Sequence, residues 1–354
     1  MGLLRFPADA IRFRGMVGTG GIGHGSFFLL DGNEPLGREE SRSGRFLDRR
    51  DYCKLHIISH YVKALLGGRM DVCPIGRVGD DADGIRLCRE MNDAGLDLRF
   101  VKTTPGRPTL FSFCLVYPDG SGGNLTTGDS ASGTVGAEAV LEAEPLLKAL
   151  GSAGIALAVP EVPLAARRAL LDAATRFGLF RAASFTRAEM DGARESGLLG
   201  EVDLLAVNLE EAAAAARIKV ADGPTPKPAV IARRAAESLA RDYPRLQLSI
   251  TGGKAGSWTW DGGSLAFDDA VDVHAAGTSG AGDAHCAGVL SGLALDLPLN
   301  EAQELGTIVA AASVTSPHTI HDGMTAELLR EVCENRIRTS ARVRGLLDNP
   351  IVGP

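Results

Sequence analysis

The sequence lacks any long uninterrupted apolar run. Hydrophobic residues make up 45% of its 354 residues, yet no stretch approaches the roughly 20 residues that a membrane-spanning helix needs. The N-terminal segment MGLLRFPADAIRFRG carries charges and a proline within its apolar part, so it does not fit a secretory signal peptide. We therefore expect a cytoplasmic protein that does not bind membranes.

Closely spaced cysteines and an excess of basic residues are also missing. The six cysteines are scattered without a C-x-x-C pair, which favours reduced, mostly buried thiols. The net charge of −7 argues against nucleic acid as a partner, because nucleic-acid binding usually needs a basic face. It does not argue against a nucleotide, since backbone N–H groups can hold phosphates.

What the sequence does have is an alternation of short apolar runs and helical patterns. IALAVP, LLAVN and LQLSITGG are typical of buried strands, and Ala- and Leu-rich helical stretches follow the first two. This alternation predicts a mostly parallel sheet covered by helices. Because no repeat, low-complexity segment or linker divides the chain, we expect residues 1–354 to form a single α/β domain.

Near the N-terminus, MVGTGGIGHG places Gly18, Gly20 and Gly23 in the G-x-G-x-x-G spacing of a dinucleotide-binding turn. An NAD(P)-dependent oxidoreductase is therefore one alternative function. A dinucleotide fingerprint needs a helix directly after its third glycine. Here HGSFFLLDGNEPLG follows, with three more glycines and a proline. We interpret the spacing as accidental.

The stretch GTSGAGDAHCAG, from Gly277, carries the strongest chemical signal. Gly280, Ala281 and Gly282 lead into a helix that we expect to open at Asp283. Small residues at a helix N-terminus let backbone N–H groups converge on an anion, and a nearby carboxylate can accept a hydroxyl proton. Phosphoryl transfer to an alcohol needs this combination. The alternative is a glycine-rich turn in which Asp283 only caps the helix.

GTSGAGDAHCAG resembles the D-T-x-G-A-G-D signature of the ribokinase-like, PfkB-type carbohydrate kinases. The resemblance implies a three-layer α/β/α sandwich with a mostly parallel central sheet and a small β lid. It implies ATP-dependent phosphorylation of a hydroxyl of a sugar or sugar-like small molecule. Asp283 would be the catalytic base, and the amides of Gly280, Ala281 and Gly282 would form the anion hole.

Other motifs in the family's order extend the resemblance to the nucleotide and metal sites. VNLEEA resembles the N-x-x-E element, which implies that Asn208 and Glu211 lie near Mg²⁺ and bind it through water. SITGGKAGSW resembles the strand and turn of the nucleotide site, which implies ATP contacts from Thr251, Gly253 and Gly256. For VNLEEA, an ordinary helix start is the alternative.

The stretch TIVAAASVTSPH, from Thr307 to His318, resembles the helix and loop that flank the adenine of ATP. Both residues are therefore candidates for the nucleotide site. A surface histidine in a loop is the alternative interpretation of His318.

The substrate end departs from the family's pattern. Family members usually carry an acid in the turn after the first strand, where this chain has Gly23 and His24. PEVPL resembles the place where many members present a substrate-binding acid, here Glu161. Cys53 and Lys54 stand where paired glycines usually open the first long helix. We expect an unusual substrate, with a non-catalytic sugar- or nucleotide-binding protein as an alternative.

The charged stretch NEPLGREESRSGRFLDRRD would ordinarily be a solvated surface. In the family that it resembles, a small strand-built lid grows from this region, so we assign lid segments to about 24–50 and 106–128. Lid strands in this family often pair between subunits. A homodimer through the lid is therefore one expectation.

Overall fold

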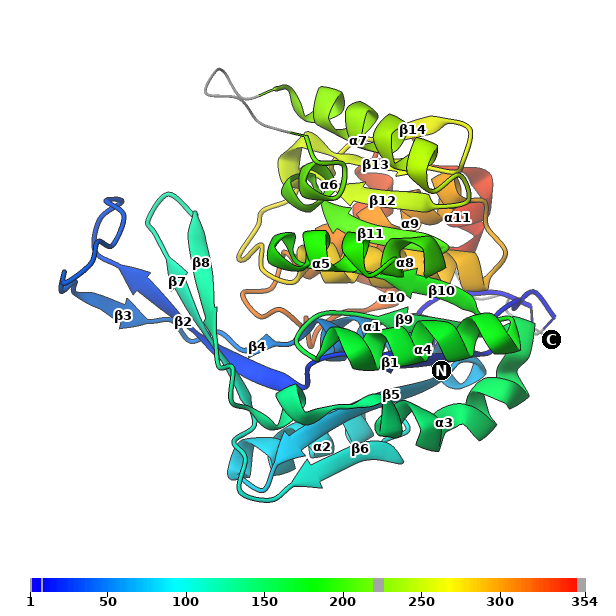
Figure 1. The fold of residues 1–354 in the computed structure, drawn as a ribbon. Helices are drawn as coiled ribbons and strands as arrows, with labels where there is room; N and C mark the ends of the chain where they lie inside the picture. The colour runs from blue at the N-terminus through cyan, green and yellow to red at the C-terminus, as the bar shows by residue number, and fades with distance from the viewer. Residues whose placement is uncertain (1, 8, 219–225, 349–354) are drawn as a thin grey trace.

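A nine-stranded sheet forms the centre of the structure, a computed structural model that describes residues 2–7, 9–218 and 226–348 (Figure 1). Its strands, in spatial order, are β14 (Leu265–Asp268), β13 (Ser257–Trp260), β12 (Gln247–Thr251), β11 (Leu204–Asn208), β10 (Phe180–Ala183), β9 (Gly154–Ala158), β1 (Gly15–Thr19), β5 (Asp71–Gly79) and β6 (Phe100–Thr104). The strands from β12 to β6 all run parallel, whereas β13 pairs antiparallel with β12 and β14 pairs antiparallel with β13. The three apolar runs predicted as buried strands form β9, β11 and β12, which confirms the mostly parallel sheet.

Helices cover both faces of this sheet and bury a separate apolar cluster on each. One face is covered by α1 (Lys54–Leu66), α2 (Ala82–Asp93), α8 (Ala281–Ala294), α9 (Leu299–Ser313), α10 (Ala326–Glu334) and α11 (Ala341–Leu347). The other is covered by α3 (Ala137–Leu150), α4 (Leu164–Phe177), α5 (Met190–Glu195), α6 (Leu209–Ala215) and α7 (Pro228–Asp242). The predicted three-layer α/β/α sandwich is therefore confirmed. Among the described residues, no helix is both long and apolar enough to cross a membrane.

The helix pair α8 and α9 packs more closely than ordinary side chains would permit. A Cβ atom added at Gly288 of α8 would lie 2.6 Å from the Cα atom of Gly306 on α9 and 3.0 Å from its backbone nitrogen. The two backbones thus touch through paired glycines. This contact fixes the position of α8, whose first turn contains Asp283.

A second, five-stranded sheet projects from one side of the central sheet (Figure 1). Its strands are β2 (Gly23–Leu30), β3 (Gly44–Phe46), β4 (Asp51–Tyr52), β7 (Leu110–Val116) and β8 (Gly122–Thr126). They follow the order β3-β2-β7-β8, and β4 also pairs with β2. The segments assigned to a lid supply β2, β3, β7 and β8. We call this structure the projecting sheet.

The carboxyl ends of β1, β9, β10, β11 and β12 meet at one edge of the central sheet. Within this sheet β5 and β6 are added on one side of β1, and the later strands, beginning with β9, are added on its other side. The order of the strands therefore reverses at β1. In open parallel sheets, ligands bind outside the carboxyl ends of strands near such a point. The topology thus predicts a binding site at this edge.

Candidate active site

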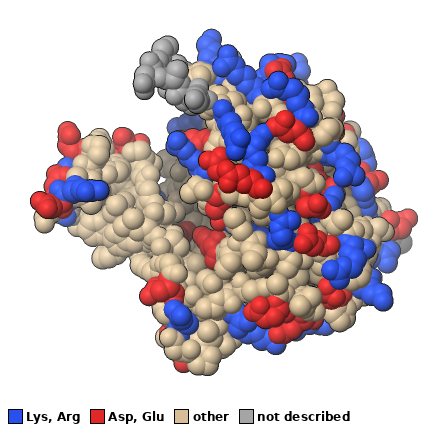
Figure 2. Space-filling model, viewed as in Figure 1, with Lys and Arg blue, Asp and Glu red and all other residues tan. Residues whose placement is uncertain are grey.

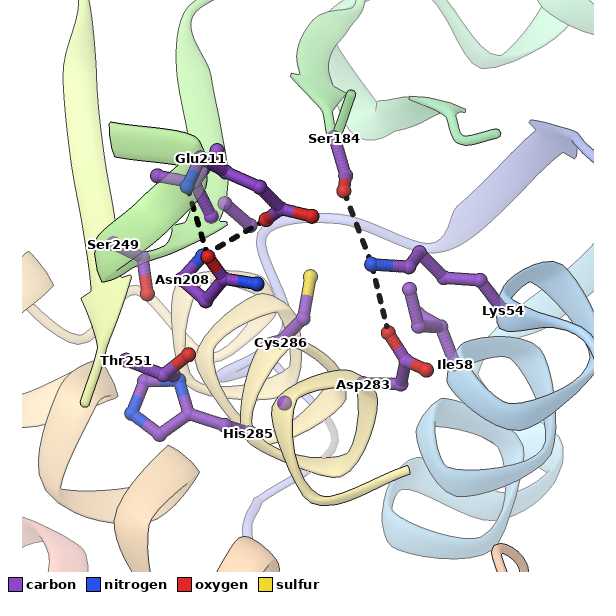
Figure 3. Close-up of a pocket in the computed structure, with 13 residues that line it drawn as sticks. Lys54, Ile58, Ser184, Asn208, Glu211, Ser249, Thr251, Asp283, His285 and Cys286 are labelled. Carbon is purple, nitrogen blue, oxygen red and sulfur yellow. Dashed lines mark hydrogen bonds and ion pairs between the residues drawn. The ribbon is translucent and has the colours of Figure 1, made fainter. Parts of the chain in front are cut away.

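A pocket lies at this edge of the central sheet, and residues from α1, α8 and the ends of β10, β11 and β12 line it (Figure 3). Its polar lining side chains are Lys54, Ser184, Asn208, Glu211, Ser249, Thr251, Asp283 and His285. Gly282 also lines the pocket. The structure therefore brings together five residues predicted for catalysis, nucleotide or metal: Asn208, Glu211, Thr251, Gly282 and Asp283.

Asp283 lies in the first turn of α8 and makes no capping hydrogen bond. The helix begins at Ala281, two residues earlier than expected, with Gly280 as its N-cap. Gly280 has a φ of 79°, a left-handed conformation that favours glycine. The interpretation of Asp283 as a simple helix cap is therefore wrong, because its side chain does not bond to the helix terminus. Its carboxylate is free for another role.

The carboxylate of Asp283 pairs with Lys54 at the start of α1. Lys54 Nζ lies 3.3 Å from Asp283 Oδ1 and donates to Ser184 Oγ at 3.3 Å (Figure 3). Burial raises the pKa of Asp283, and the charge of Lys54 opposes that shift. Burial also lowers the pKa of Lys54, but the charges of Asp283 and Glu211 outweigh it and raise that pKa above its ordinary value. Lys54 therefore stays charged and favours an ionised Asp283.

The N-terminus of α8 presents backbone N–H groups beside this carboxylate, of which the Ala281 N–H already donates to the Thr278 carbonyl at 3.3 Å. The first N–H groups of a helix have no partner within it, and the helix dipole favours negative charge there. A Cβ atom added at Gly280 would lie 2.9 Å from the backbone oxygen of Thr319, so a side chain has no room. One added at Gly282 would meet only Thr251 Oγ1, at 3.8 Å. The helix terminus is therefore open toward Thr251 and could receive an anion.

Asn208 and Glu211 form a capping box at the start of α6. Asn208 Oδ1 accepts from the Glu211 N–H at 2.9 Å, and Glu211 Oε2 accepts from the Asn208 N–H at 2.9 Å (Figure 3). The alternative of an ordinary helix start is thus correct in its local geometry. Both side chains also line the pocket. Burial raises the pKa of Glu211, and the charge of Lys54 opposes this.

The other predicted nucleotide residues occupy different surroundings. Gly253 and Gly256 shape the turn after β12, with φ values of 57° and 90°. Thr307 is buried on α9, where its hydroxyl lies 3.4 Å from Ser257 Oγ. His318 Nδ1 accepts from the Arg50 N–H at 3.0 Å, so this loop contacts the segment that precedes β4. These four residues do not line the pocket in Figure 3.

The predicted substrate residues lie between the projecting sheet and the central sheet. Gly23 pairs with Leu110 in the projecting sheet. His24 Nε2 lies 3.2 Å from Asp83 Oδ2, and burial lowers its pKa. Glu161 follows β9 and has a φ of 75°, a strained conformation for a residue other than glycine. Its Oε2 atom is buried without a hydrogen-bond partner.

Two side chains near Asp283 were not predicted as site residues. Lys54 could have been found, because a lysine in a position that the family reserves for glycine is a sequence signal. Ser184 follows β10 without any motif. Its place beside Lys54 depends on the neighbouring strand and is visible only in the structure.

Glu161 leads to a prediction about stability. Burial is the main cause that raises its pKa from 4.5 to about 7, and the charges of Asp283 and Asp51 add to the shift. A carboxyl group with a raised pKa binds more protons in the folded state, so its contribution to stability is present below pH 4.5 and is lost as the pH rises through about 7. The unfolding free energy of the parent should therefore decrease as the pH rises over this range. We expect the decrease to be about 1–3 kcal/mol smaller in Glu161→Gln.

Urea unfolding of the ligand-free protein at pH 5 and pH 7.5 measures this effect. Glu237→Gln is the matched control, because Glu237 is an exposed residue of α7. The same pH dependence in Glu161→Gln and in the parent would contradict the assigned burial.

The sandwich with its projecting sheet is the fold of ribokinase, as the similarity to solved ribokinase structures shows. The family model for pfkB family carbohydrate kinases matches residues 61–326, which is more than half of the chain. The chain therefore belongs to the pfkB family of carbohydrate kinases. No curated protein sequence matches it.

Solved structures of kinases share the fold. Ribokinase from Cryptococcus neoformans var. grubii, in complex with ADP, is 17% identical with a TM-score of 0.68, covering 92% of this chain and 100% of its own. The Burkholderia thailandensis nucleoside kinase in complex with inosine is 16% identical with a TM-score of 0.69, covering 89% and 96%. Arabidopsis thaliana ribokinase, complexed with ribose and ATP, is 15% identical with a TM-score of 0.67, covering 91% and 98%.

Proposed function

We propose that the protein transfers the γ-phosphoryl group of ATP to a hydroxyl of a sugar or sugar-like small molecule. The observation that carries this proposal is the pairing of Asp283 with Lys54 beside the open N-terminus of α8. A base and an anion hole are adjacent there, at the edge of the sheet where a ligand is expected. Membership of a kinase family supports the same chemistry.

In this proposal Asp283 accepts the proton of the attacking hydroxyl. Burial raises the pKa of Asp283, and the neighbouring charge of Lys54 opposes that shift and favours the ionised carboxylate. The backbone donors at Gly280, Ala281 and Gly282 stabilise the negative charge on the transferring phosphoryl group. Positioning and charge neutralisation dominate phosphoryl transfer, so these groups supply the main requirements.

In this proposal the pocket receives the phosphates of the nucleotide together with Mg²⁺. Among the described residues, no group of three or more His, Cys, Asp or Glu side chains could hold a metal ion alone. Mg²⁺ commonly keeps several waters and takes phosphate oxygens as ligands, so it needs few protein ligands. Glu211 uses Oε2 in the capping box, and Oε1 has no protein hydrogen bond among the described contacts. Asn208 and Glu211 would hold the ion through water, and it would neutralise charge on the phosphates.

A panel of sugars and nucleosides, assayed with ATP and Mg²⁺, tests the function. We expect phosphate transfer to at least one member, which would exclude a non-catalytic binding protein. Titration with NAD(P)H tests the oxidoreductase alternative. Saturable NAD(P)H binding without phosphate transfer to any acceptor would overturn the kinase proposal.

We further propose that the projecting sheet is a lid over the acceptor and that it joins two subunits. The aromatic rings of Phe28, Phe46 and Phe113 form one apolar cluster, with ring centroids 5.1–6.0 Å apart. Leu125 is directly opposite Phe113 on the neighbouring strand. Phe46 and Leu125 are 65% and 64% exposed, and Figure 2 shows few charged side chains on the broad surface of this sheet. An exposed apolar face of this kind is typical of an interface.

The dimer proposal predicts a change in mass. We expect the parent protein to be a dimer at micromolar concentration and Phe46→Ser to shift it toward the monomer, because the serine removes apolar area from the interface. Sedimentation velocity measures both states. Ile337→Ser is the matched control, since Ile337 is 93% exposed and lies outside the projecting sheet. A parent that sediments as a monomer would contradict the proposal.

A further inference from the structure

Two glycines of the opening stretch lie beneath carboxylates that other segments contribute. A Cβ atom added at Gly21 would lie 2.6 Å from Glu161 Oε2, and one added at Gly25 would lie 2.4 Å from Asp51 Oδ2. Any side chain at either position would take the space of a carboxylate. The glycines therefore make room for two acids where the usual family position, Gly23, has none.

Strand pairing fixes the position of Asp51. Asp51 pairs with Gly25 and Tyr52 pairs with His24, while the Cys53 N–H donates to the Gly23 carbonyl at 3.3 Å. This pairing holds residues 51–53 against β2, immediately before the start of α1. Asp51 is thus held only three residues before Lys54, the partner of Asp283.

Asp51, Glu161 and Asp283 are close enough to influence one another electrostatically. Burial is the main cause that raises the pKa of Asp51 to about 6, and the charge of Asp283 adds to it. The charges of Asp283 and Asp51 likewise add to the raised pKa of Glu161. Figure 2 shows acidic side chains in the hollow between the projecting sheet and the body. The three carboxyl groups therefore lie near one another, and of them Asp283 also lines the pocket in Figure 3.

The hydrogen bonds of these acids leave acceptor capacity unused. The donor to Asp51 Oδ2 is the Cys114 thiol at 3.4 Å, and a thiol is a weak donor. The Tyr52 N–H and the Thr319 hydroxyl also favour the ionised form of Asp51. The Cys53 thiol, also a weak donor, favours the ionised form of Glu161. Glu161 Oε2 is nevertheless buried without a hydrogen-bond partner, and buried polar atoms are normally hydrogen-bonded. A ligand that brings several O–H donors would satisfy both groups.

The charge of the site also limits what can bind. Lys54 is the only cationic side chain among the residues that line the pocket, and it already pairs with Asp283. Among the described residues neither Asp51 nor Glu161 forms an ion pair, and Arg167, on which the charge of Glu161 acts, already pairs with Glu189. A phosphate or carboxylate on the acceptor would therefore face these two acids with the nearby cations already paired, and like charges at short range repel.

We infer that Asp51 and Glu161 together bind adjacent hydroxyl groups of the acceptor, which is an uncharged polyol, sugar or nucleoside and not a sugar phosphate or sugar acid. Asp51 is thereby a specificity-determining residue contributed by the projecting sheet. The assignment of an acceptor rests on the proposed kinase function.

Equilibrium binding to matched neutral and anionic compounds tests this inference. The pairs are ribose with ribose 5-phosphate, glucose with gluconate, and inosine with inosine 5′-monophosphate, titrated calorimetrically in the presence of a non-hydrolysable ATP analogue. We expect a neutral member to bind more tightly than its anionic counterpart. Asp51→Asn should raise the Kd of that neutral compound about 10- to 100-fold, because a hydrogen bond to a charged group is lost. The affinity for the ATP analogue should not change.

Two further variants separate this role from a structural one. Gly25→Ala keeps every charge but adds a Cβ atom where Asp51 Oδ2 lies, so it should also weaken binding of the neutral compound. Asp48→Asn removes an exposed charge from the same segment and should bind as the parent does. Parental affinity in Asp51→Asn, tighter binding of an anionic member, or no binding of any neutral member would each overturn the inference.

Phosphate transfer is measured separately on the same proteins. Binding of a neutral compound that depends on Asp51 but is not followed by phosphorylation would refute the kinase proposal and retain the specificity site. Phosphorylation that is unaffected by Asp51→Asn, in both KM for the acceptor and kcat, would refute the specificity site and retain the kinase.

Discussion

Replacement of Asp283 by Asn is expected to lower kcat by about 100-fold or more, because a positioned general base contributes about 10²–10⁴-fold. Asparagine has nearly the same shape as aspartate but cannot accept the hydroxyl proton. Lys54, Ser184 and the N-terminus of α8 remain in place. The affinities for ATP and for the acceptor should therefore change far less than turnover.

Single-turnover kinetics with an acceptor from the panel measures this loss. Asp272→Asn is the matched control, since Asp272 is an exposed acid in the loop that precedes α8. We expect that control to retain parental kcat. Near-parental turnover in Asp283→Asn would remove the proposed base from the mechanism.

The second large effect concerns the contact between α8 and α9. Gly288→Val is expected to lower the free energy of unfolding by about 3 kcal/mol or more, at the upper end of the range for overpacked cores. The added atoms would meet backbone atoms of Gly306 and Leu305 at 2.6–3.0 Å. Backbone cannot rotate away as the end of a flexible side chain can, so the helices must separate. That movement would also displace Asp283.

Urea unfolding followed by circular dichroism gives the free energy of unfolding. Gly345→Val, on α11, is the matched control because no atom lies within 4 Å of a Cβ atom added there. The same substitution should then change stability by less than about 0.5 kcal/mol. Equal stability of the two variants would contradict the close packing of α8 and α9.

The sequence was sufficient to predict a mostly parallel sheet covered by helices because its signals are local. Short apolar runs followed by helical patterns specify parallel strands with covering helices, and these runs became β9, β11 and β12. Asn208 and Glu211 were also recognisable, because VNLEEA resembles the N-x-x-E element of the family. Their capping box is a contact between residues three apart, so the same motif predicts both the helix start and a candidate metal site.

The acceptor side could not be predicted in the same way. Asp51 lies within a charged stretch that resembles a solvated surface, and its place beside Gly25 depends on the pairing of β4 with β2. The partner of Asp283 is equally distant in sequence, because Lys54 opens the first long helix and Asp283 lies near the start of α8. Contacts of this kind arise from tertiary packing, which no local pattern encodes.

The four residues from Asp51 to Lys54 connect the projecting sheet to α1 and contain both side chains that this part of the chain brings to the proposed acceptor site. Replacing this segment by the corresponding segment of another family member would thus remove a carboxylate and an ammonium group together. For protein engineering, the segment is a compact unit for altering the proposed acceptor site, whereas the proposed nucleotide site lies on β11, β12 and the start of α8. Directed libraries confined to these positions and to Gly21 and Gly25 would sample that choice with few mutations.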